Sequence, residues 1–259
     1  HVAKSFNFHG FSLYINNACA SGLYALEVAS QLITSGKCAV VLVAAVDSPD
    51  AFKSLWFKSS NVYSRSGKIK SFCSDADEFI MEEGGAAFIL EDLKNARKRK
   101  CKIYAEYLGG GFNLESWKVT FPKIDSNFYI QAILQCLKVS GLKRQDVDLV
   151  MPHAPANLIT DIFELKSLMA VFKNKKNSPL VTAFKSYVGH NSGGSTLLEL
   201  AVGLMCLRNN DILPLMHTKN LQFEDRIRYV TRRTSKDIRS LIKTCSAFAF
   251  IVEACSSKT

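Results

Sequence analysis

Residues 11–46 read FSLYINNACASGLYALEVASQLITSGKCAVVLVAAV, and their pattern indicates the fold class. It begins with an alternating apolar run, Phe11–Ile15, and continues with a helical pattern from Leu23 to Thr34 that is followed by a glycine, Gly36. It ends in the nearly continuous apolar run Ala39–Ala45. This order predicts a β-α-β unit. The apolar second strand favours a parallel sheet that is covered on both faces.

The rest of the chain alternates in the same way. The patterns predict strands at Ala86–Asp92, Lys102–Phe112, Val147–His153 and Pro179–Phe184, helices at Asn127–Ser140, Leu158–Phe172 and Ser195–Asn209, and one final strand over Thr244–Cys255. We therefore expect an α/β protein with two similar halves in tandem.

Length and composition exclude several classes of protein. The chain has 259 residues, of which 47% are hydrophobic, so it can bury a sizeable core. Its longest apolar runs are the length of a strand, and no signal-peptide pattern is present. The eight cysteines are scattered without a C-x-x-C pair, a pattern typical of reduced thiols rather than of a disulfide framework or a zinc site. We expect a cytoplasmic protein.

The net charge of +10 is concentrated in three stretches, Lys94–Lys102, Lys173–Lys176 and Arg226–Arg233. Basic patches attract polyanions or acidic proteins. Nucleic acid is disfavoured as a partner because no aromatic residues are interleaved with the charges. The alternative for each stretch is a solvated helix end.

Cys19 lies where the first strand is expected to turn into a helix, among the small residues Ala18, Ala20, Ser21 and Gly22. Small neighbours allow a substrate to approach, and the free N–H groups at the start of a helix stabilise a thiolate or an oxyanion. The alternative is a small buried structural residue. The motif alone leaves both interpretations open.

Three further residues follow strands in the same way: His153, Lys185 and His190. In open α/β sheets the edge at the carboxyl ends of the strands is where sites are built. A thiol and a histidine together are the arrangement of nucleophilic catalysis by cysteine, although a protease would need only one histidine.

Four blocks of the sequence resemble those of a known family. The segment NNACASGLYALEVASQLITSGKCAVVLVAAVDS is similar to the active-site segment of the β-ketoacyl-acyl-carrier-protein synthases, which have the thiolase-like fold. Three more blocks, SFCSDADEFIMEEGGAAFILED, VMPHAPANLITDIFELKSL and VTAFKSYVGHNSGG, resemble blocks of that family in the same order along nearly the whole chain. The elongating class, with one cysteine and two histidines, is the one they resemble.

The resemblance implies a layered α-β-α-β-α sandwich. Residues 1–95 would form the remainder of the N-terminal half with the nucleophile, and residues 96–259 the C-terminal half with both histidines. The family has a further segment before the strand that leads to the cysteine, so we expect the first half to be incomplete.

The implied reaction is a decarboxylating Claisen condensation. Cys19 would accept an acyl chain from a carrier-protein thioester, and His153 and His190 would bind the malonyl thioester carbonyl and stabilise the enolate. Lys185 would balance the charge. The implied supporting residues are Glu164, Asp161 and Phe250, the backbone N–H groups of Cys19 and Phe250 forming an oxyanion hole for the acyl group.

No cofactor or metal is implied, because the substrates are carried on the phosphopantetheine arm of an acyl carrier protein. Such carriers are acidic and suit a basic surface. The resemblance also implies a homodimer, or a heterodimer with another ketosynthase-like chain.

Two departures from the family pattern leave alternatives open. Residues 153–157 read HAPAN, without the threonines that usually follow the first histidine, and the glycine-rich GFGGTN loop is reduced to AFAFIVEA. Both favour a catalytically weak partner subunit that resembles a chain-length factor, whereas the retained Cys19, His153, Lys185 and His190 favour an active synthase. A thiol hydrolase or a basic binding module would leave Lys185 and the second histidine unexplained.

Overall fold

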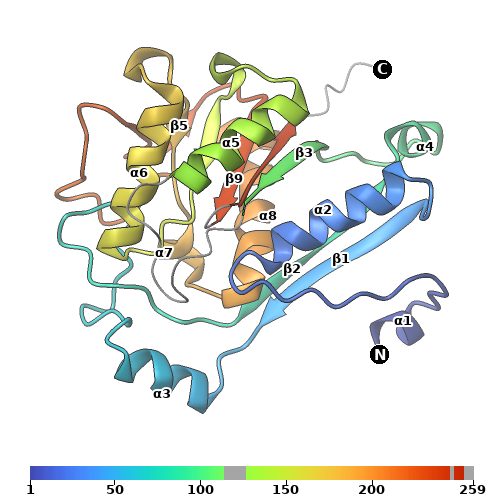
Figure 1. Ribbon diagram of the computed structural model, residues 1–259, viewed down its shortest axis with the longest axis horizontal. Helices are drawn as coiled ribbons and strands as arrows, with labels where there is room; N and C mark the ends of the chain where they lie inside the picture. Colours follow the sequence, from blue (N-terminus) through green and yellow to red (C-terminus); the bar gives the residue numbers. More distant parts are fainter. Residues whose placement is uncertain (114–126, 246–247, 254–259) are drawn as a thin grey trace.

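The computed structural model describes residues 1–113, 127–245 and 248–253, which form stacked layers of sheet and helix (Figure 1). A two-stranded sheet lies on one side of helices α2 (Ser21–Thr34) and α8 (Ser195–Asn209). A six-stranded sheet lies on their other side, and helices α5 (Asn127–Ser140) and α6 (Leu158–Phe172) cover its far face. The predicted α/β architecture is confirmed.

The two-stranded sheet differs from the prediction. Its strands, β1 (Val40–Asp47) and β2 (Gly84–Glu91), run antiparallel along their whole length. The parallel β-α-β pairing predicted for this region is therefore wrong among the described residues. Phe11–Ile15 forms no strand: Phe11 is 68% exposed and Tyr14 is 90% exposed. An alternating run becomes a strand only where a neighbour completes its hydrogen-bond ladder, and no described strand lies beside this one.

The six-stranded sheet carries the chemistry-bearing loops. Its strands stand in the order β3 (Glu106–Phe112), β10 (Phe248–Glu253), β9 (Ser240–Cys245), β4 (Leu149–Met151), β5 (Leu180–Val181) and β7 (Arg228–Tyr229). β10 is antiparallel to both of its neighbours, whereas β9, β4, β5 and β7 are parallel. The single final strand predicted over Thr244–Cys255 is wrong, because β9 and β10 form an antiparallel pair. The run contains no Gly or Pro, so it gave no turn signal.

The three long helices of the second half have the predicted bounds, because each combines a helical apolar period with clear end signals. The side chain of Asn157 accepts the Thr160 N–H at 3.0 Å and begins α6. Asn210 ends α8 in a left-handed conformation, with φ of 51°.

One close contact brings the start of α2 against the start of α8. A β-carbon on Gly22 would lie 2.6 Å from Thr196 Oγ1 and 2.7 Å from Leu197 Cγ, so only glycine allows this approach. The two helices share an apolar core with both sheets, formed in part by Leu23, Leu26 and Leu200. The turn that carries Cys19 is thereby held against the loop that precedes α8.

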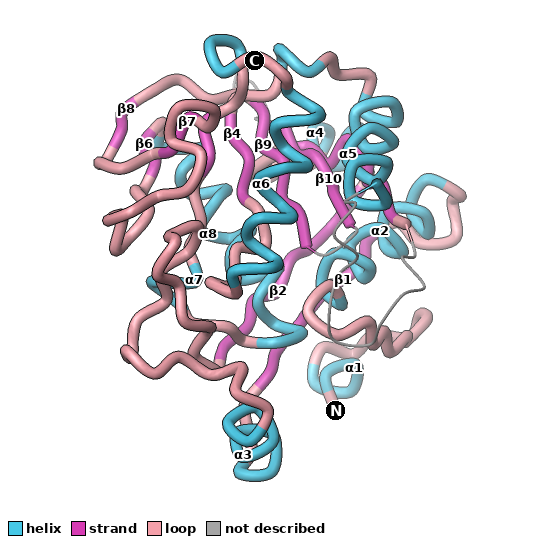
Figure 2. Tube along the Cα trace, turned by 60° about the vertical axis from the view of Figure 1, so that its left-hand side comes forward, coloured by secondary structure: helices cyan, strands magenta, loops and turns pink. Residues whose placement is uncertain are grey.

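Short elements complete the described chain: α1 (Val2–Ser5), α3 (Ala51–Ser59), α4 (Leu93–Lys98), α7 (Lys185–Val188), the 3-10 turns η1 (Arg144–Asp146), η2 (Lys175–Asn177) and η3 (Ser192–Gly194), and the pair β6 (Asp211–Ile212) and β8 (Thr234–Ser235). Figure 2 shows α3 projecting from one end of the molecule. Among the described residues, none of the helices has the length and apolar character that a membrane crossing requires.

Candidate active site

Cys19 occupies the tight turn that leads into α2. The turn is closed by the Ser21 hydroxyl, which donates to Ala18 O at 2.7 Å and accepts the Asn17 N–H at 2.8 Å. The side chain of Cys19 is half-buried, and its Sγ lies 3.3 Å from Nε2 of His190. The predicted meeting of a thiol and a histidine is therefore present in the structure.

His190 is held by backbone groups. It lies between α7 and η3, and its own N–H donates to Ile80 O at 2.9 Å. Its Nδ1 accepts the N–H of Ser192 at 3.1 Å, and its ring lies against Phe79 with a centroid distance of 4.8 Å. Because Nδ1 accepts a hydrogen bond, the proton of the neutral ring is on Nε2, which faces Cys19.

His153 follows β4 and is buried beside His190. The two rings are perpendicular, with centroids 5.5 Å apart. Nδ1 of His153 lies 3.4 Å from Sγ of Cys245, on β9. The Cys19 Sγ and one nitrogen of each ring all lie within 4.8 Å of one another, so three chain segments far apart in sequence converge on one point.

The backbone around His153 is fixed by buried charged groups. Glu164 accepts the N–H groups of His153 and Ala154, at 2.8 and 2.7 Å. The Lys185 ammonium donates to His153 O at 2.7 Å, and the Lys243 ammonium donates to Pro152 O at 3.0 Å. Lys185 and Glu164 therefore hold the backbone of this segment in position.

The two lysines share one carboxylate. Glu199, on α8, forms ion pairs with both Lys185 and Lys243, the latter at 2.8 Å, and all three side chains are fully buried. Burial lowers the pKa of Lys243, whereas the pKa of Lys185 is raised because its burial is outweighed, chiefly by the charge and the hydrogen bond of Glu199, so Lys185 is the cation held beside the site. A positive potential beside the site favours a thiolate and an enolate over their neutral forms.

Burial determines the charge state of the site. Burial, together with the positive charge of Lys185, lowers the pKa of His153 well below the ordinary range and that of His190 to about 3. Both rings are therefore neutral. Burial also raises the pKa of the Cys19 thiol, and Lys185 and the backbone N–H of Cys19 oppose this shift without reversing it. The expected thiolate stabilisation at the helix start is present but is outweighed by burial.

Asp161 and Phe250 have partners other than the two histidines. Asp161 is buried, and its Oδ2 accepts the Phe72 N–H at 2.6 Å, so it ties the start of α6 to the loop before β2. Phe250 lies within β10 and is paired with Lys243 on one side and Gly110 on the other. A strand between two neighbours uses its N–H groups in the ladders, so this register argues against the predicted oxyanion-hole role of Phe250, which stays a prediction. The Phe250 side chain lies outside the described part of the structure.

Sequence reasoning missed five residues around the histidines: Glu199, Lys243, Cys245, Tyr129 and Phe79. Two of them left a signal. Glu199 is the one acidic residue in the largely apolar segment Ser195–Asn209, and Lys243 is the one charged residue in Ser240–Cys245. An isolated charge in a buried element needs a partner, and these two are partners of each other.

The cluster of Cys19, His153 and His190 is compact enough to hold a metal ion. A histidine that binds a metal through one ring nitrogen normally donates its other N–H to an acceptor. His190 does the opposite, because its Nδ1 accepts the Ser192 N–H and its Nε2 carries the proton. The donor set therefore suits an anionic oxygen better than a metal ion.

Comparison with protein families agrees with this geometry. The model of the beta-ketoacyl synthase N-terminal domain matches residues 1–96, and that of the C-terminal domain matches residues 104–219. Fold and site thus define a thiolase-like ketosynthase scaffold. The chain belongs to the β-ketoacyl synthase family.

Individual relatives are distant in sequence and close in fold. The chain is 28% identical to probable polyketide synthase 17 of Dictyostelium discoideum over 93% of its own length and 10% of that protein. It is 27% identical to the mitochondrial 3-oxoacyl-[acyl-carrier-protein] synthase of Arabidopsis thaliana, with 96% and 56% covered, so it spans little more than half of that relative. One solved structure is a complex of a type II polyketide synthase acyl-carrier protein with its ketosynthase. A chain of that complex superposes on this one with a TM-score of 0.92 at 21% identity, and the match covers 98% of this chain and 66% of that one.

Proposed function

We propose that the chain carries the acyl-transfer and condensation centre of a β-ketoacyl-acyl-carrier-protein synthase, acting in fatty-acid or polyketide synthesis. One observation carries this proposal: a half-buried thiol lies 3.3 Å from the Nε2 of a neutral histidine, beside a second neutral histidine. Cys19, His153 and His190 are the catalytic residues of this proposal, and Lys185 and Glu164 support them.

In the first step, Sγ of Cys19 attacks the acyl carbon of a carrier-bound thioester. A new thioester forms on Cys19, and the carrier thiol leaves with the proton. The charge of Lys185 opposes the burial that raises the pKa of the Cys19 thiol, so it favours the thiolate during the attack.

In the second step, a malonyl thioester binds with its carbonyl oxygen toward the histidines. Loss of carbon dioxide leaves an enolate whose oxygen needs hydrogen-bond donors already in place. Two neutral imidazoles supply such donors. The enolate carbon then attacks the acyl carbon on Cys19, the carbon–sulfur bond breaks, and the thiolate is regenerated.

A thiol hydrolase leaves part of the site unexplained. Such an enzyme needs one histidine beside its cysteine. The second neutral ring, His153, and the buried ammonium of Lys185 would then have no role in the reaction.

A catalytically weak partner subunit is the second candidate function. The sequence HAPAN after β4 and the run AFAFIVEA in place of the glycine-rich loop support it, since both depart from the family pattern. The retained thiol and histidine pair support the synthase. Acylation of Cys19 separates the two.

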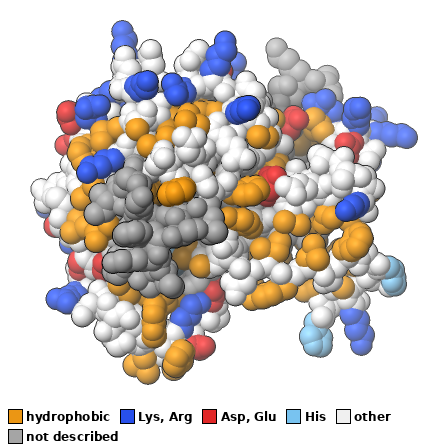
Figure 3. Space-filling model, viewed as in Figure 1, with side chains coloured by type: hydrophobic (Ala, Val, Ile, Leu, Met, Phe, Trp, Pro, Cys, Tyr) orange, Lys and Arg blue, Asp and Glu red, His pale blue; other side chains and the backbone are white. Residues whose placement is uncertain are grey.

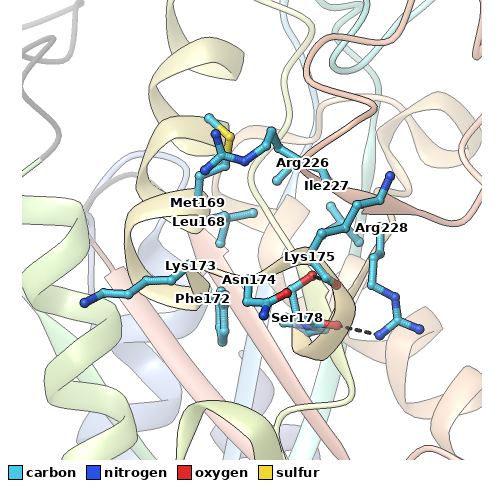
Figure 4. A pocket seen from close by; sticks show the side chains of 12 residues that line it. Leu168, Met169, Phe172, Lys173, Asn174, Lys175, Ser178, Arg226, Ile227 and Arg228 are labelled. Atoms are coloured by element: carbon cyan, nitrogen blue, oxygen red, sulfur yellow. Dashed lines mark hydrogen bonds between the residues drawn. The ribbon is translucent and has the colours of Figure 1, made fainter.

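The basic surface supports an acidic carrier protein as partner. Figure 3 shows Lys and Arg side chains along the upper rim of one face and over α4, Leu93–Lys98. The other two basic stretches meet in space, because Lys173, Lys175, Arg226 and Arg228 line one small pocket at the end of α6 (Figure 4). Two of these side chains already donate hydrogen bonds within the protein: Lys175 donates to the carbonyl of Glu224, and Arg228 donates to the carbonyl of Ser178.

Exposed apolar side chains support association with a second ketosynthase-like chain. Phe11, Leu13 and Tyr14 are 61–90% exposed, and Val46 and Ile89 are exposed on the two-stranded sheet. Figure 3 shows hydrophobic side chains gathered over this side of the molecule. We expect a dimer by light scattering at micromolar concentration.

The deciding experiment is incubation with an acyl-carrier-protein thioester, followed by intact-mass measurement. We expect one acyl adduct, located on Cys19 by peptide mapping and lost in Cys19→Ala. Cys38→Ala is the matched control, because Cys38 is also partly exposed but has no hydrogen bond to a histidine among the described contacts. An adduct that persists in Cys19→Ala contradicts the synthase proposal.

A second variant tests the histidine pair separately. Cys19→Gln cannot be acylated but leaves both rings in place. We expect it to keep or raise the decarboxylation of malonyl-carrier protein, measured as released carbon dioxide. Loss of decarboxylation in this variant would show that the histidines do not stabilise the enolate on their own.

A further inference from the structure

The two histidines of the site reach the same protonation state by different means. In His190 the donor to Nδ1 is the backbone N–H of Ser192, two residues further along the chain. The residue at the same offset from His153 is Pro155, which has no N–H. A donor for Nδ1 of His153 must therefore come from elsewhere.

Cys245 is in the position to supply it. Its Sγ lies 3.4 Å from Nδ1 of His153, within hydrogen-bond reach for sulfur, and the side chain is fully buried. Burial raises the pKa of Cys245 well above its ordinary value, so the group is a thiol with a proton to donate. Burial and the charge of Lys185 keep the ring of His153 neutral, so one ring nitrogen carries a proton and the other can accept a hydrogen bond.

The donor is held in place by its strand. Cys245 and Lys243 are two residues apart on β9, so their side chains point to the same face of the sheet. Lys243 holds the carbonyl of Pro152, one residue before the histidine. The same face of β9 thus fixes both the ring of His153 and the backbone that carries it.

We propose that Cys245 is a positioning residue: its thiol donates to Nδ1 of His153 in place of the backbone N–H that Pro155 lacks, and so keeps the proton on Nε2, where the ring can donate to a substrate oxygen. Its catalytic consequence rests on the proposed function. The assignment of the tautomer does not.

The first test measures the tautomer directly. Full-length protein labelled with ¹⁵N-histidine is studied by NMR above pH 7, and His153 and His190 are assigned through single His→Gln variants. We expect protonated Nε2 and unprotonated Nδ1 on both rings. In Cys245→Ala only His153 should change, toward a mixture of tautomers. Cys245→Ser, which keeps a donor of similar size, should retain the original pattern. A protonated Nδ1 on His153 in the original protein, or unchanged shifts in Cys245→Ala, would overturn the proposal.

A double variant tests the substitution of one donor for another. Pro155→Ala introduces an N–H two residues after His153. In the Cys245→Ala background it should restore the Nε2–H tautomer. Failure to restore it in a folded double variant would overturn the part of the proposal that assigns the thiol the role of the missing amide.

The second readout is activity. Malonyl decarboxylation should fall by about tenfold or more in Cys245→Ala, as expected when a catalytic histidine is in the wrong tautomer, and should be retained in Cys245→Ser. Acylation of Cys19 should change little in either variant, because His190 is untouched. If the protein does not decarboxylate malonyl thioesters but the NMR shifts respond as described, the proposed function fails and the positioning role stands. If decarboxylation is unchanged in Cys245→Ala, the catalytic consequence is wrong.

Discussion

His153 and His190 lie side by side, yet the molecule supports them differently. His190 takes its hydrogen bonds from backbone groups of its own loop and of the loop before β2. His153 depends on side chains that come from β9, α6 and α7: Cys245, Glu164 and Lys185. Support by the backbone survives most substitutions nearby, whereas support by side chains can be removed one group at a time.

We expect the His153 half of the site to be more sensitive to distant changes than the His190 half. The ion cluster of Lys185, Glu199 and Lys243 holds the carbonyls of residues 152 and 153 but donates to no described backbone group of His190. Substitutions in this cluster should therefore disturb His153 first.

The largest effect is expected for Glu199→Gln. This change leaves two buried ammonium groups facing each other without a counter-charge, which typically costs about 3–5 kcal/mol. We expect a loss of this size in the free energy of unfolding measured in urea. The ¹⁵N shifts of His153 should move further than those of His190; equal movement of both would remove the distinction between the two supports.

A smaller effect is expected for Lys243→Met. Glu199 keeps Lys185, but the buried carbonyl of Pro152 loses its donor, a loss of about 1–3 kcal/mol. Chemical denaturation would measure it. Lys236→Met is the matched control, because Lys236 is 39% exposed and its ion pair with Asp148 spans 3.8 Å, so it should change stability by less than about 0.5 kcal/mol. A neutral result for Lys243→Met would mean that water replaces the lost donor.

The lowered pKa of His190 should make the stability of the protein depend on pH. The pKa of His190 is about 3 in the folded protein and about 6.5 in an unfolded chain. Between these values the unfolded state binds a proton that the folded state does not, so stability falls as the pH is lowered through this range. The slope for one group is at most about 1.4 kcal/mol per pH unit.

The variant His190→Asn isolates this contribution. Buried Asp161 and Glu164 have raised pKa values and act in the opposite direction, but they are present in both proteins and cancel in the difference. We expect a shallower loss of stability for His190→Asn between pH 6.5 and 4, measured by urea unfolding at each pH. Parallel pH profiles would show that His190 is protonated in the folded protein.

The smallest effect is expected for Ser192→Ala. The donor to His190 is the backbone N–H of Ser192, so loss of the hydroxyl should leave the tautomer unchanged and alter stability by less than about 0.5 kcal/mol. The ¹⁵N spectrum checks this. A changed tautomer would mean that the side chain, and not the backbone, supports His190.

Local sequence signals predicted the long helices well. Asn127–Ser140, Leu158–Phe172 and Ser195–Asn209 have the predicted bounds, because periodicity and end signals are contained within each segment. The pattern of strands was less informative. Phe11–Ile15 alternates like a strand but forms none, and Thr244–Cys255 reads as one strand but contains the end of β9 and all of β10. Strand formation depends on partners that the local sequence does not name.

The residues of the candidate site were likewise only partly predictable from the sequence. The residue types and their order along the chain were enough to single out Cys19, His153, Lys185 and His190, because a thiol and two histidines that follow strands are chemically distinctive. Glu199, Lys243 and Cys245 come from segments that read as plain core, and their partners are 14 to 92 residues away.

Local sequence patterns were sufficient to predict the α/β class and the long helices of the second half. The reactive side-chain types and their places after predicted strands singled out Cys19, His153, Lys185 and His190. The protons that these residues carry could be assigned only from the folded structure. A tautomer or a pKa depends on burial and on the donors and charges within a few ångströms of the ring, and these come from α6, α8 and β9 only after the chain has folded.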